Sequence, residues 1–105
     1  EHAREYGEYF LNGLRKLKDT YPAIGDVRGR GLFIGFEFVR DRITLEPDAE
    51  EATRVVREMR ERGVLLSTDG PHHNVIKIKP PMVLTRQDID MTLDHLNEVL
   101  SGNGD

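Results

Sequence analysis

Apolar residues recur at helical spacing in three segments of the chain. Near the start, apolar and small side chains follow one another at steps of three and four, which predicts an amphipathic helix over residues 3–21 that Pro22 ends. Similar stripes predict helices over residues 48–62 and 86–100. In chain order, the three stripes are Ala3, Tyr6, Gly7, Phe10, Leu14, Leu17 and Tyr21; Ala49, Ala52, Val56 and Met59; and Ile89, Leu93, Leu96 and Leu100.

The ends of the second and third predicted helices carry capping residues. Asp48 begins the second helix, and Glu51 follows three residues later, as in a capping box. Gly63 is expected to end this helix as its C-terminal cap. Thr85 is expected to cap the third helix, and residues 101–105 are expected to form a flexible tail because they contain glycine and end the chain.

Strand-like segments separate the helices. Residues 32–40 and 75–79 are predicted to form strands, with a shorter one over residues 64–67. The first strand places Leu32, Ile34, Phe36 and Phe38 on one face, and Phe33, Gly35, Glu37 and Val39 on the other. Since both faces carry apolar side chains, something is expected to cover each of them. The segment TDGPHHN is predicted to be a loop, and Pro80 and Pro81 halt the last strand.

The segment GDVRGRGLFIG is rich in glycine. A dinucleotide-binding loop needs a strand before its glycines and a helix after them, whereas here a strand follows. We therefore expect Gly25, Gly29 and Gly31 to supply turns around short extended pieces. Arg28 and Arg30 in this segment could bind an anion, although such a pair in a turn is more often solvated or salt-bridged.

The order of these elements predicts an α+β fold. We expect one domain over residues 1–105, with a small mixed or antiparallel sheet and three helices packed mainly on one face. A chain of 105 residues has room for one hydrophobic core.

Composition narrows the class of protein. The net charge of −4 at pH 7 argues against nucleic acid as a partner, and the lack of cysteine excludes disulfides and thiolate chemistry. No apolar run approaches the ~20 residues that cross a bilayer, so we expect no membrane association and a cytoplasmic location. The chain begins with Glu1 and not Met, directly before the first predicted helix, so we expect it to be a piece of a longer protein.

The histidines and hydroxyls give weak catalytic signals. His72 and His73 are adjacent, so in an extended segment their side chains point opposite ways, and a polar loop is favoured over a metal site that also uses Asp69. Ser67 and Thr68 lie outside any nucleophile elbow. We predict no catalytic, metal or cofactor-binding residue in this chain.

Lys77 is the candidate binding residue. Alternation along residues 75–79 places Ile76 and Ile78 on the core face, and Lys77 and Lys79 together on the other face. These lysines could protect an exposed sheet edge, or they could bind an anion. The spacing alone leaves both interpretations open.

The segments VRGRGLFIGFEFV and GVLLSTDGPHHNVIKIKPPMVLT, with the closing helix, resemble the C-terminal small domain of class III aminotransferases, which depend on pyridoxal phosphate. The resemblance runs over nearly the whole chain. The segment STDGP followed by NVIKIKPPM is most similar to the corresponding segment of the phospho-lyases that act on phosphoethanolamine or phosphohydroxylysine.

The resemblance implies a homodimeric enzyme whose large domain, on the same polypeptide, holds pyridoxal phosphate. The isolated chain would bind no cofactor and would be inactive, and its role would be to help close the active site and position a small amine substrate. In several members of this class an arginine at the position of Lys77 grips a substrate carboxylate, so lysine here puts that clamp in doubt. Lys77 would instead bind the substrate's charged end.

Two other classes of function stay open. The chain could be a stand-alone α+β ligand-binding module, which would bind a ligand in isolation. It could also be a protein-interaction module, which would form a stable complex with an unrelated protein.

Overall fold

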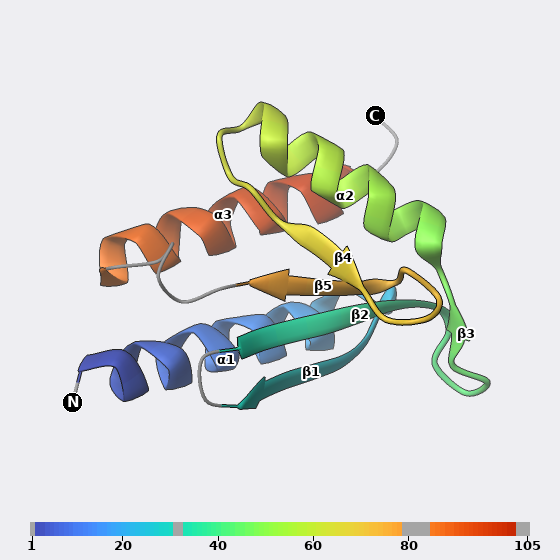
Figure 1. Ribbon diagram of the computed structural model, residues 1–105, viewed down its shortest axis with the longest axis horizontal. Helices are drawn as coiled ribbons and strands as arrows, with labels where there is room; N and C mark the ends of the chain where they lie inside the picture. The colour runs from blue at the N-terminus through green and yellow to red at the C-terminus, as the bar shows by residue number, and fades with distance from the viewer. Residues whose placement is uncertain (1, 31–32, 79–84, 103–105) are drawn as a thin grey trace.

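The computed structural model describes residues 2–30, 33–78 and 85–102 of the 105-residue chain. Within this part, helices alternate with short groups of strands (Figure 1). The elements are α1 (His2–Thr20), β1 (Ile24–Arg30), β2 (Phe33–Asp41), β3 (Glu46–Pro47), α2 (Ala49–Glu61), β4 (Ser67–Asp69), β5 (Val75–Ile78) and α3 (Arg86–Gly102).

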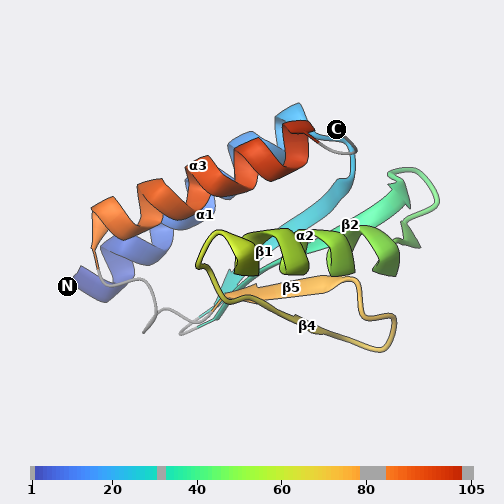
Figure 2. The same ribbon diagram turned by 90° about the horizontal axis from the view of Figure 1, so that it is seen from above.

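The strands form an antiparallel sheet in the order β1-β2-β5-β4, and the short β3 pairs with the end of β2. The helices gather on one face of the sheet, and α1 and α3 run side by side (Figures 1 and 2). This arrangement confirms the predicted α+β fold. None of the described helices combines the length and the apolar character that a bilayer crossing requires.

The core lies between the helices and the inner face of the sheet. The inner face contributes Ile34, Phe36, Phe38, Ile76 and Ile78, all buried as alternation predicted. The rings of Phe36 and Phe38 meet edge to face with their centroids 5.5 Å apart. The helices contribute Phe10, Leu11, Leu14, Leu17, Ala52, Val55, Met59, Ile89, Leu96, Val99 and Leu100. The predicted inner position Val56 is only partly buried, because Val55 takes its place in the core.

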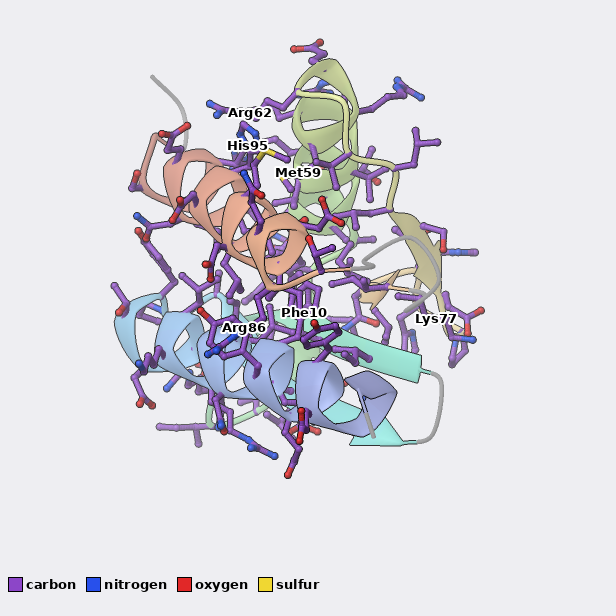
Figure 3. The ribbon with its side chains drawn as sticks, turned by 90° about the vertical axis from the view of Figure 1, so that its left-hand side faces the viewer. Phe10, Met59, Arg62, Lys77, Arg86 and His95 are labelled. Carbon is purple, nitrogen blue, oxygen red and sulfur yellow. The ribbon has the colours of Figure 1, made fainter. Side chains whose placement is uncertain are left out.

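Polar contacts join the helices along their edges. The Arg86 guanidinium of α3 lies 4.4 Å from the centroid of the Tyr9 ring of α1. At the other end of the helical layer, Arg62 Nη1 of the α2 C-cap contacts His95 Nδ1 of α3 at 3.2 Å, and it also pairs with Glu98 (Figure 3). These contacts link α3 to α1 on one side and to α2 on the other.

The predicted caps are present, with one difference. The Asp48 side chain accepts a hydrogen bond from the Glu51 backbone N–H at 3.1 Å, and the Thr85 hydroxyl accepts one from Asp88 at 3.0 Å. Gly63 has a φ of 88° and ends α2 in the left-handed conformation that favours glycine. The Glu51 carboxylate, however, binds Arg54 and not the Asp48 backbone, since the Asp48 N–H already donates to the Phe38 carbonyl.

The prediction that glycines form turns before β2 is wrong for Gly25 and Gly29. Both lie within β1, a seven-residue strand that pairs with β2. A Cβ atom on Gly25 would lie 2.7 Å from Val39 Cγ1, and one on Gly29 would lie 2.4 Å from Leu11 Cδ1. The glycines therefore allow close packing of neighbouring side chains against the strand backbone. Gly31 lies outside the described residues.

Several predicted boundaries also move. The short strand expected over residues 64–67 is instead β4 at Ser67–Asp69, because pairing with β5 and not local composition sets its register. The strand β3 was not predicted at all. Helix α3 continues to Gly102, two residues beyond its predicted end, while residues 103–105 of the expected tail lie outside the described part.

Val39 does not need a second domain to cover it. The alternation places it on the face opposite the core, yet only 2% of its surface is exposed within this chain. It packs over Gly25, where the pairing of β1 with β2 shifts between Ile24 and Asp26. Phe33, the other apolar residue expected on that face, has a side chain outside the described part.

Candidate functional site

Lys77 lies on the outer face of the sheet, away from the helices (Figure 3). Its neighbours Ile76 and Ile78 are buried in the core, whereas 38% of the Lys77 side chain is exposed. The outward orientation predicted from alternation is confirmed. The interpretation as edge protection is wrong, because β5 pairs with β2 on one side and with β4 on the other. Lys79 lies outside the described residues.

Asp69 is the carboxylate partner of Lys77. The Lys77 Nζ lies 2.7 Å from Asp69 Oδ2, across the ladder between β5 and β4. The hydrogen bond from Lys77, together with one from the Gly70 backbone, lowers the pKa of the Asp69 carboxyl. Both side chains of the pair are partly exposed to solvent, so the pair contributes little to stability. Its main effect is to orient the lysine side chain.

Hydrogen bonds to β2 anchor the hairpin that joins β4 to β5. Asn74 is buried, and its side-chain amide donates to the Phe38 carbonyl at 2.9 Å. The Phe38 N–H donates in turn to the Asn74 carbonyl at 2.9 Å. These bonds tie the start of β5 to β2, next to the hairpin that carries Asp69 and Lys77.

A second ion-paired group occupies the other side of the same face. Arg28 of β1 donates from Nη2 to Glu37 Oε1 at 2.5 Å, and its Nε lies 3.2 Å from Asp26 Oδ2. Glu37 is mostly buried at 19% exposure, while 61% of the Arg28 side chain is exposed. The partly buried carboxylate therefore orients an accessible guanidinium.

Members of both groups (Arg28 and Glu37, Asp69 and Lys77) line one open groove of about 590 Å³ on the outer face. Its walls combine cations, carboxylates and backbone from β1, β2, β4 and β5 with the turn after β4. The lining residues are Arg28, Gly29, Ile34, Gly35, Glu37, Leu45, Pro47, Asp69, Gly70, Pro71, His72, Asn74, Val75 and Lys77. The groove presents two cations and two carboxylates, an arrangement that suits a small zwitterion or an anion bound by hydrogen bonds from the cations.

The described lysines do not fit a covalent pyridoxal phosphate site. A lysine that reacts with a carbonyl must be desolvated and uncharged, whereas Lys77 pairs with a carboxylate in an open groove. Lys16 and Lys18 stand on α1 in the helical layer, away from the groove. No group of three or more potential metal ligands occurs among the described residues, and His72 and His73 lie in the turn after β4.

Sequence reasoning singled out Lys77 and considered Arg28, but it did not bring them together. The missing signal was the pairing of β1 with β2, because the glycines of β1 were interpreted as turns. Once that strand is recognised, Arg28 and Lys77 fall on the same face and in the same groove.

Comparison with known proteins identifies the relatives of this chain. Residues 1–100 match the family model described as Aminotransferase class-III. The chain is 42% identical over 102 residues to ethanolamine-phosphate phospho-lyase homolog 1 of Caenorhabditis elegans, covering 96% of this chain and 22% of the relative.

Solved structures share the fold. A phospholyase from Arthrobacter in complex with phosphoethanolamine superposes with a TM-score of 0.86 at 36% identity, covering 94% of this chain and 24% of that one. A PLP-bound amine transaminase from an uncultivated Pseudomonas species gives 0.82 at 32% identity, covering 97% and 23%. The chain thus spans about a quarter of the length of these relatives.

Proposed function

The chain belongs to the class-III aminotransferase family, and we propose that it forms the small domain of a longer pyridoxal-phosphate-dependent enzyme that eliminates phosphate from a small phosphorylated amine. The large domain of the same polypeptide would hold the cofactor, in a cytoplasmic homodimer. The small domain would help close the active site and hold the charged end of the substrate in place.

The observation that carries this proposal is the position of Lys77. It stands on the outer face of an internal strand, in a groove, with a carboxylate that fixes its direction. Lysine presents a compact point charge and lacks the planar fork with which arginine holds a carboxylate. The absence of the bidentate carboxylate clamp, together with the phospho-lyase relatives, supports phosphate as the bound group.

The bond chemistry would belong to the cofactor, which stabilises negative charge on the substrate carbon when it is bound. The residues of this chain would bind and orient. Lys77 would hold the phosphate so that the bond to the departing oxygen is correctly aligned, and the groove would limit the approach of water when the domains close.

The test is steady-state phosphate release from phosphoethanolamine by the full-length enzyme loaded with pyridoxal phosphate. Elimination should proceed without any 2-oxo acid as amino acceptor, whereas transamination requires one. Lys77→Ala should lower kcat/KM by about 1 to 3 kcal/mol, which is roughly 5- to 150-fold, through the loss of a charge-assisted hydrogen bond. Thermal stability should barely change, because the ion pair of Lys77 is exposed.

Lys16→Ala is the matched control, since Lys16 is an exposed lysine on α1. It should leave both the kinetics and the melting temperature unchanged. Wild-type kinetics in Lys77→Ala would exclude Lys77 as a substrate-binding residue. A large loss of stability would show that Lys77 serves the fold.

We also propose that the isolated chain is inactive. Addition of pyridoxal phosphate to the 105-residue chain should give no dialysis-resistant absorbance band of a lysine-bound cofactor. A band that persists on dialysis and disappears on mutation of one lysine of this chain would contradict the proposal.

A further inference from the structure

Two rows of side chains cross the outer face of the sheet side by side. Strand pairing aligns Arg28 with Gly35, Gly35 with Lys77, and Lys77 with Ser67. The adjacent row aligns Asp26, Glu37, Val75 and Asp69 in the same way. Because directly paired residues project to the same face, the first row carries the cations and the second the carboxylates.

Gly35 separates the two cations of the first row. Neighbouring strands lie about 4.8 Å apart, so the backbones of Arg28 and Lys77 are roughly 10 Å apart on either side of β2. The absence of a side chain at Gly35 leaves the floor between them as bare backbone. A Cβ atom there would approach the Ile76 carbonyl oxygen to 3.2 Å and would reduce the depth of the groove.

The carboxylate row orients the cations and balances their charge, because Asp26, Glu37 and Asp69 supply three carboxylates for the two cations. Contacts with Asp26 and Glu37 engage Nε and Nη2 of Arg28, yet the side chain keeps 61% of its surface exposed. Lys77 shares its charge with Asp69 at 2.7 Å. A phosphate monoester carries about 1.5 to 2 negative charges near neutral pH, so it would be held here by hydrogen bonds from the individual cations and not by a net positive charge of the site.

We propose that Arg28 is a second anion-binding residue, which together with Lys77 grips the phosphate of the substrate above Gly35. This inference rests on the proposed function and adds a second binding residue to it. Arg28 adds guanidinium N–H donors in a fixed planar arrangement that the lysine ammonium lacks, and Glu37 holds its guanidinium over the groove. The carboxylates beside the cations suit a substrate whose amine is positively charged.

The experiment measures two constants in the full-length enzyme: KM for phosphoethanolamine and Ki for inorganic phosphate as a competitive inhibitor. Arg28→Gln should raise both by roughly 10- to 100-fold, the range for one lost charge-assisted hydrogen bond, with a smaller change in kcat. Arg28→Lys should fall between the wild type and Arg28→Gln, because it restores the charge without the fork. Gly35→Ala should also raise Ki, since both cations stay but the floor is filled.

Arg40→Gln is the matched control. Arg40 is an exposed arginine of β2 that pairs with carboxylates but does not line the groove. Its replacement should leave KM and Ki unchanged. An unchanged Ki in Arg28→Gln, or an equal rise in Arg40→Gln, would overturn the proposal. If Arg28→Gln does not fold, the Ki values of Arg28→Lys and Gly35→Ala provide the test. A raised Ki in both supports the proposal, and an unchanged Ki in both overturns it.

Failure of the proposed function would look different. If the wild-type enzyme releases no phosphate from phosphoethanolamine, the elimination reaction is wrong, but inorganic phosphate can still be tested as a ligand by its effect on the melting temperature. A rise in the wild type that is lost in Arg28→Gln and kept in Arg40→Gln would support the two-cation site. No rise in the wild type would overturn the site itself.

Discussion

The two faces of strands β2 and β5 differ sharply although they share one backbone. The inner face carries Ile34, Phe36, Phe38, Ile76 and Ile78, each at most 4% exposed, and it packs against the helices. The outer face carries ion pairs around a glycine and borders an open groove. Because side chains alternate, every second residue of such a strand can pack in the core, and the residues between them can contact a ligand on the outer face.

The largest effect on stability should appear when alanine replaces two adjacent residues of β5 that point to opposite faces, one at a time. Ile76→Ala removes a fully buried side chain and should lower the free energy of unfolding by about 2 to 5 kcal/mol. Lys77→Ala should change it by less than about 1 kcal/mol, because its ion pair is exposed. Urea denaturation of both variants, followed by circular dichroism, measures the difference. Similar losses would mean that the outer face also supports the fold.

The glycines give a second comparison of the faces. Gly29→Ala places a Cβ 2.4 Å from Leu11 Cδ1 in the core and should cost about 1 to 3 kcal/mol by overpacking. Gly35→Ala meets the Ile76 carbonyl oxygen at 3.2 Å and Val75 Cγ1 at 3.8 Å, and we expect a change below about 1 kcal/mol. The denaturation midpoints of the two variants measure this difference. A greater loss of stability for Gly35→Ala than for Gly29→Ala would contradict the expectation.

Lys77→Arg tests how closely the outer face is shaped for its ligand. The guanidinium is larger and planar, so we expect kcat/KM to fall by about 1 kcal/mol, or roughly fivefold, despite the conserved charge. The kinetics of the full-length enzyme measure this effect, with thermal unfolding on the same samples. Activity above that of the wild type would favour a carboxylate substrate and therefore transamination.

The smallest effect concerns the pH dependence of the Lys77–Asp69 pair. The pKa of Asp69 is lowered in the folded chain, so its contribution to stability is present above the ordinary carboxyl value of 3.8 and is lost as the pH falls through the lower folded value. The stability difference between wild type and Asp69→Asn should therefore shrink in acid. Lys77→Ala should reduce that pH dependence, because Lys77 is the larger cause of the lowered pKa and the Gly70 backbone bond remains. An unchanged pH dependence would assign the shift to the Gly70 backbone instead.

Patterns within single segments predicted much of this fold. The helices follow from stripes such as Phe10, Leu14 and Leu17, and the helix ends follow from Asp48, Gly63 and Thr85. Strand alternation also predicted that Lys77 would point away from the core. These features depend on residues a few positions apart, so the local sequence contains the information.

Pairing across the sheet could not be predicted in this way. The sequence determined that Lys77 faces outward, whereas only the tertiary structure decided that β5 is an internal strand and that Arg28 shares its groove. The glycines of β1 favour turns locally, but packing against Leu11 and Val39 makes that segment a strand. The physical reason is that alternation defines the two faces of a strand, while its neighbours are chosen by contacts between residues far apart in the chain.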